Sequence, residues 1–127
     1  MLQPHQRAAR IPNGSGVQWV QFLDARFASF DAEPALAFVL QAIEAQSPLI
    51  AGVRGFLEVS RGQSLPVVFA IHGELNLESR EISFRQEQPE AAWQGQFSLN
   101  GRVLQLRRAG EVKAIALVHE ETLRDLV

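Results

Sequence analysis

The chain has 127 residues, of which 46% are hydrophobic and 20% charged, and its formal net charge is −2. This length and composition are typical of one globular domain with its own core, and they argue against an intrinsically disordered chain. The chain has no cysteine, which excludes disulfides and thiolate metal sites, and its weak net charge gives no general attraction for nucleic acid.

Residues 1–16 are polar and rich in proline and glycine, which predicts a flexible N-terminal arm ahead of a single domain over residues 17–127. The arm has no apolar stretch of the kind that a signal peptide needs. We find no apolar run long enough to span a bilayer. We therefore expect a cytoplasmic protein that does not associate with membranes.

The first part of the expected domain carries apolar side chains at steps of three and four, which predicts two amphipathic helices. The first is expected over residues 17–30 and the second over residues 34–46, where several alanines raise the helix propensity. Pro34 suits the first turn of a helix because it has no N–H to leave unpaired. Trp19 and Phe22 make the apolar face of the first helix unusually wide.

From residue 53 onward apolar and polar side chains alternate, which predicts about six antiparallel strands in a meander. Gly73 interrupts the inward-facing row and indicates a bulge or a sharp bend. The predicted fold class is therefore α+β, with two N-terminal helices packed on a curled antiparallel meander. The alternative is a closed β-barrel with external helices, since a strongly twisted meander can curl until its edges meet.

Two turns set the expected register of the last strands. Asn100-Gly101 favours a two-residue hairpin turn, which places Trp93 opposite Arg108. Ala109-Gly110 predicts the next turn, and a two-residue turn there places Ile115 opposite Leu104 and Leu117 opposite Arg102.

The side chains with catalytic or metal-binding chemistry form no motif of known spacing. His72 and His119 each precede a carboxylate by two residues, a pattern that would suit a metal ion only if their strands met. The other carboxylates gather beside turns, where solvation accounts for them. We therefore predict no catalytic residue, no metal and no cofactor, and the sequence favours a protein that is not an enzyme.

Two non-catalytic functions fit the apolar residues. The first is an interaction or self-assembling module, a homo-oligomer or the binder of a partner protein, with its interface at Trp19, Phe22, Ile115 and Leu117. The second is a carrier of a small apolar ligand, with its pocket between sheet and helices. The residues of that pocket, or simply of the core, would be Phe27, Phe30, Phe69, Phe84, Trp93 and Phe97.

Basic side chains collect on the last two hairpins. Arg102, Arg107 and Lys113 predict a face that binds anions. The alternative is a solvated outer face on which Arg108 pairs with Glu111 across the turn. Nucleic acid is not an expected partner of either arrangement, because sheets that bind single-stranded nucleic acid need more positive charge and exposed aromatic side chains.

Overall fold

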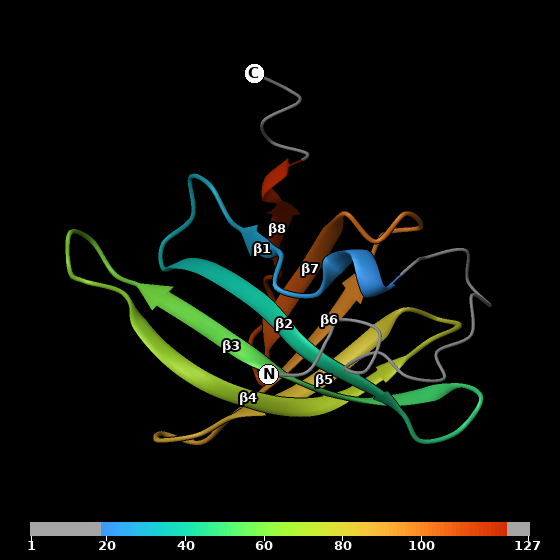
Figure 1. Ribbon diagram of the computed structural model, residues 1–127. Helices are drawn as coiled ribbons and strands as arrows, with labels where there is room; N and C mark the ends of the chain where they lie inside the picture. Colours follow the sequence, from blue (N-terminus) through green and yellow to red (C-terminus); the bar gives the residue numbers. More distant parts are fainter. Residues whose placement is uncertain (1–18, 122–127) are drawn as a thin grey trace.

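The structure is a computed structural model that describes residues 19–121, which form a closed antiparallel barrel of eight strands in chain order (Figure 1). A short 3-10 helix, η1 (Trp19–Phe22), precedes the first strand. The arm expected over residues 1–16 lies outside the described residues. The strands are β1 (Arg26–Ala28), β2 (Ala35–Ala45), β3 (Ile50–Ser60), β4 (Val67–Asn76), β5 (Glu81–Gln86), β6 (Ala91–Phe97), β7 (Val103–Arg108) and β8 (Ile115–His119).

The predicted α+β class is wrong, because neither N-terminal helix forms. The first expected helix is occupied by η1 and β1, and the second by β2. Closure of the sheet agrees with the alternative prediction, but the external helices of that alternative are not found in residues 19–121. The described chain is thus nearly all β.

A β-bulge explains why β2 resembles a helix in sequence. Leu36, Phe38 and Leu40 are buried at every second position, with the small Ala37 buried between the first two, and the pairing with β3 then shifts register between Leu40 and Ala42. The next buried side chain is Ile43, three positions after Leu40. Because the bulge inserts one extra residue, Leu36, Leu40 and Ile43 are spaced by four and three residues, which is also the spacing of a helical face.

Burial in the barrel outweighs the helix propensity of β2. The alanines of this segment favour a helix over a strand by less than about 1 kcal/mol each. Burying one large apolar side chain contributes about 1.5–3 kcal/mol. Phe38, Leu40 and Ile43 are at most 1% exposed, so the strand that places them inside the barrel is the more stable arrangement.

The meander from β3 to β8 agrees with the alternation in the sequence. Trp93 pairs with Arg108 as predicted. The predicted register of β7 and β8 is wrong, because Leu104 pairs with Leu117 and not with Ile115. The connection between these strands spans residues 109–114 and not a two-residue turn, which moves the register by two positions.

Glycines allow the strands to approach closely where the sheet curves. A Cβ atom on Gly73 would lie 2.0 Å from the carbonyl oxygen of Ser83, and one on Gly55 would lie 2.0 Å from that of Val39. The ladder between β4 and β5 keeps its register through Gly73, so this residue marks a bend and not a bulge. Such bends let a flat ladder close into a barrel.

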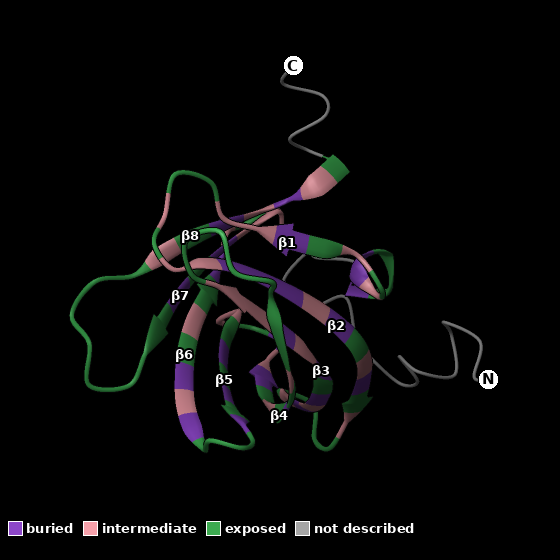
Figure 2. Ribbon diagram, turned by 90° about the vertical axis from the view of Figure 1, so that its left-hand side faces the viewer, coloured by how far each residue is buried: buried purple, intermediate pink, exposed green. Residues whose placement is uncertain are grey.

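Side chains fill the barrel interior at the end where η1 lies, which we call the closed end or closed half. The opposite end is open. Figure 2 shows buried residues alternating with exposed ones along β5, as expected for a strand with one face toward the core. At the closed end, the Trp19 ring packs edge-on against Phe97 with centroids 5.0 Å apart, and Phe22 packs against Phe27 at 5.7 Å. Since Trp19 and Phe22 belong to η1, this helix plugs the barrel.

Candidate functional site

The open end of the barrel contains a cavity of about 490 Å³. This volume lies within the range of roughly 300–1,000 Å³ found for small-molecule sites. All four loops at this end contribute to the rim, and inward-facing side chains of the strands form the wall. The rim includes Pro34, Arg61, Ser64, Leu65, Pro89, Glu111 and Lys113, and the wall includes Val59, Val67, Phe69, Gln86, Trp93, Leu106, Arg108 and Ile115.

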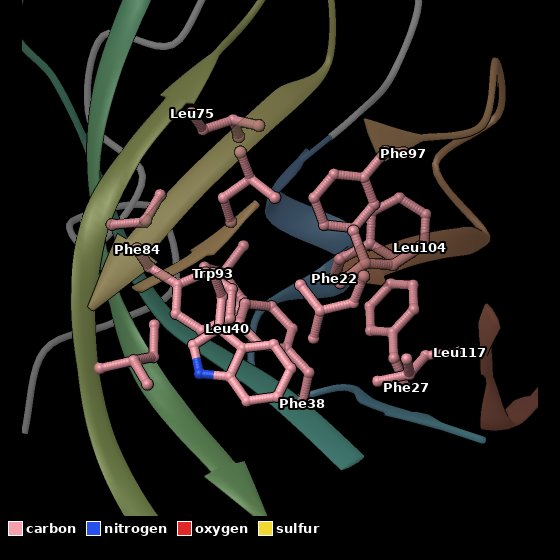
Figure 3. Close-up of a cluster of buried hydrophobic side chains, with 14 of the residues drawn as sticks. Phe22, Phe27, Phe38, Leu40, Leu75, Phe84, Trp93, Phe97, Leu104 and Leu117 are labelled. Atoms are coloured by element: carbon pink, nitrogen blue, oxygen red, sulfur yellow. The ribbon is translucent and has the colours of Figure 1, made fainter. Parts of the chain in front are cut away.

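Aromatic side chains separate this cavity from the closed half of the barrel. Trp93 and Phe84 stack with ring centroids 6.4 Å apart and an interplanar angle of 14°, and Phe38 lies 5.4 Å from Phe84. Figure 3 shows these three rings together, with Phe22 and Phe27 gathered at a distance from them. The cavity is therefore a pocket with an aromatic base and not a channel through the barrel.

A buried amide fixes the tryptophan that lines the cavity. Trp93 Nε1 donates a hydrogen bond of 2.8 Å to Gln86 Oε1, and Gln86 Nε2 donates one of 3.1 Å to the carbonyl oxygen of Pro89. Gln86 is only 5% exposed. Since both polar side chains are satisfied within the protein, the indole is held in one orientation against the cavity. Gln86 was not predicted to face inward, although its alternation with Ile82 and Phe84 is the sequence signal for that direction.

Three inward-facing rows of side chains end on a cation at the rim. Arg61 follows Leu57 and Val59 at the end of β3, and Arg108 follows Leu104 and Leu106 on β7. Lys113 stands two positions before Ile115, the first residue of β8. All three cations line the cavity. Apolar rows that end on cations give the site an apolar interior with a basic rim.

The aromatic residues predicted for a pocket are divided between the cavity, the core and the surface. Phe69 and Trp93 line the cavity, and Phe84 packs behind Trp93. Phe27 and Phe97 fill the closed end with centroids 5.7 Å apart. Phe30 is 62% exposed on the loop between β1 and β2.

The residues predicted for an interface lie inside the barrel. Trp19, Phe22 and Leu117 are buried in the core of the chain itself. Ile115 is half-buried and lines the cavity. These side chains are therefore not part of the surface that the described chain offers to a partner.

The basic residues predicted for an anion-binding face do not share one face. Arg102 follows the turn between β6 and β7, at the end of the barrel that η1 closes. Arg107 is exposed on β7, where its Nη2 donates a hydrogen bond of 3.1 Å to Gln94 Oε1. Lys113 lines the cavity. Within residues 19–121 no ion pair of 4.0 Å or less joins Arg108 to Glu111, so the alternative pairing does not form either.

The two histidines of the described chain do not meet. His72 is exposed on β4, with Nδ1 3.9 Å from a carboxylate oxygen of Glu87. His119 is buried on β8, four strands away around the barrel. Burial lowers the pKa of His119, and Nδ1 finds no hydrogen-bond partner. A metal site shared by the two histidines is not formed.

Comparison of the sequence with protein-family models and with curated proteins finds no match. In residues 19–121 no helix has the length and apolar character needed to cross a membrane.

A polar hollow of about 580 Å³ also lies on the outer face, over Gln94, Gln96 and Gln105 of β6 and β7. The cavity at the open end differs from it by its apolar wall and aromatic base.

Proposed function

We propose that this protein is a carrier that binds a small apolar ligand in the cavity at the open end of the barrel. The observation that carries the proposal is the cavity itself, which has Trp93, Phe69 and Ile115 on its wall and enough volume for one small molecule. Eight-stranded barrels are just wide enough either to be filled by side chains or to hold one small ligand. Here the closed half is filled, whereas the open half is not.

An interaction module is the second candidate, and exposed apolar side chains favour it at one place. Leu65 is 87% exposed, and Val67 and Val68 are 54% and 55% exposed. They lie at the tip of the β3–β4 hairpin, which projects from the body of the barrel (Figure 1). The candidate has less support than the carrier, because the four residues expected at its interface lie inside the barrel.

Filling the cavity tests the carrier function. We expect Ile115→Trp to weaken binding of the neutral apolar probe N-phenyl-1-naphthylamine by at least about tenfold, because the larger side chain occupies the ligand volume. Ala116→Trp is the matched control, since Ala116 is the next residue of β8 and is exposed on the outer face. Probe fluorescence measures the affinity, and circular dichroism checks that both variants fold.

The oligomeric state separates the two candidates. A carrier should bind the probe as a monomer with one site, and native mass spectrometry would show the bound mass. Wild-type protein that fails to bind the probe, or that binds it equally after Ile115→Trp, would contradict the carrier function. A probe-free dimer that dissociates on Val68→Ser would support the interaction module instead, since Val68 is exposed and does not line the cavity.

A further inference from the structure

We propose that the ligand is an amphiphile whose anionic head group is bound by Arg108 and Lys113 at the rim. The inference rests on the proposed carrier function, and it adds the chemical class of the ligand. Its basis is the position of these two side chains at the end of inward-facing apolar rows. A wholly apolar ligand would place no negative charge beside these two cations.

The β7–β8 hairpin brings the two cations to the same cavity. Leu106 pairs with Ile115 at the last paired position of this ladder. Arg108 lies two residues beyond Leu106 on β7, and Lys113 lies two residues before Ile115 in the connection between the strands. On β7, two residues correspond to roughly 7 Å, at about 3.3 Å per residue. Both cations therefore line the cavity beyond an apolar pair, where its wall meets solvent.

The neighbouring strand completes the boundary. Arg108 also pairs with Trp93 on β6, whose indole lines the cavity. Arg61 directly follows β3, which is four strands from β7 and so on the facing side of the closed barrel. A ligand that reaches from the aromatic base to the rim thus passes from aromatic and aliphatic contacts to positive charge.

Within residues 19–121, no ion pair neutralises the charges at the rim. Glu111 is the one carboxylate among the described residues of the cavity lining, against Arg61, Arg108 and Lys113. Among residues 19–121, no carboxylate oxygen lies within 4.0 Å of a cationic nitrogen of these three side chains. On the outer face, by contrast, Arg26 is held by two carboxylates. A carboxylate or phosphate head group would supply the missing partner, and arginine binds both well.

Three probes with one chain length test the inference: dodecanoate, dodecan-1-ol and dodecyltrimethylammonium. At pH 8, below the micellar concentrations, we expect calorimetry to show dodecanoate bound at least about tenfold more tightly than the alcohol, and the cation bound most weakly. The preference for dodecanoate should decrease as salt is added, because the charges at the rim are partly exposed.

Matched variants assign the preference to these side chains. Arg108→Gln and Lys113→Gln should each reduce the preference for dodecanoate over dodecan-1-ol, and the double variant should abolish it, while alcohol affinity stays unchanged. Arg107→Gln is the control, because it removes the same charge from the next residue of β7 but on the outer face. It should retain the preference.

The outcomes distinguish the two proposals. Equal affinity for dodecanoate and the alcohol in the wild-type protein would overturn the head-group inference and leave the carrier function standing. An equal loss of preference in Arg107→Gln and Arg108→Gln would also overturn it, since the effect would then come from net charge. If none of the probes binds and the neutral naphthylamine fails as well, both proposals are wrong.

Discussion

At the scale of single residues, His119 is an unusual element of the core. It is 5% exposed, and its ring lies 5.3 Å from that of Phe22 and 5.4 Å from that of Phe27. Its pKa is lowered, mainly because burial disfavours the imidazolium, and the charge of Arg102 adds to this effect. Glu120 and Glu121 act in the opposite direction but do not reverse the shift. The fold therefore favours neutral His119.

This lowered pKa makes stability depend on pH in a defined direction. Below the ordinary histidine pKa of 6.5, the unfolded chain binds a proton that the folded chain resists, so stability falls as the pH decreases towards the folded-state pKa. We expect the free energy of unfolding, measured with urea, to fall between pH 7.5 and pH 5.5. His119→Phe should reduce that fall, because phenylalanine keeps the ring contacts and cannot take up a proton.

His72→Gln is the control for this prediction. His72 is exposed on the outer face, so its replacement should leave the pH dependence as it is in the wild-type protein. A fall in stability that is equally large in His119→Phe would show that carboxylates, and not His119, cause it.

At the scale of secondary-structure elements, the bend of β4 at Gly73 depends on the lack of a side chain. A Cβ atom there would also lie 2.5 Å from the Cα atom of Phe84, and backbone cannot move aside as the end of a side chain can. We expect Gly73→Ala to lower the free energy of unfolding by more than about 2 kcal/mol. Glu74→Ala, the exposed neighbour, should change it by less than about 0.5 kcal/mol.

Denaturation with urea measures both variants at one pH. A Gly73→Ala protein as stable as the wild type would mean that β4 and β5 separate at this point without cost, and that closure of the barrel does not depend on the bend.

The elements also show how far the sequence predicts the fold. β3 to β8 are predicted by the alternation of apolar and polar residues, because each strand turns one face to the core and is joined to the next by a short connection. β2 could not be predicted in this way, because its bulge gives the buried side chains a helical spacing. β1 has only three residues, which is too short for any period to be visible. Local patterns therefore predict a strand only where its register is regular.

The candidate site was predictable in part for the same reason. Phe69 and Trp93 lie on regular strands, so their inward direction followed from alternation. The rim could not be predicted, because Arg108 and Lys113 come to the same cavity only through the β7–β8 hairpin. The path of this hairpin depends on the loop at residues 109–114, whose length the Ala109-Gly110 pair does not reveal.

At the scale of the whole molecule, the barrel is closed by its shortest ladder. β1 and β8 share two paired positions, Phe27 with His119 and Ala28 with Val118. β3 and β4, in contrast, pair over ten positions. We call the ladder between β1 and β8 the seam. Arg26 supports it on the outer face by donating hydrogen bonds to the carboxylates of Glu58 and Glu120. Arg26 is 44% exposed, so these ion pairs contribute little, under about 1 kcal/mol.

Hydrogen exchange should therefore show the barrel opening first at this seam. Separating β1 from β8 breaks a ladder of two paired positions, whereas separating β3 from β4 breaks one of ten. We expect the amides of β1 and β8 to exchange well before those of β3 and β4 when followed by mass spectrometry in native conditions. Equal protection of the four strands would mean that Phe27 and His119, packed against the aromatic rings of η1, couple the seam to global unfolding. In that case Phe27→Ala should cause early exchange at β1 and β8, because it removes the ring that connects the seam to η1.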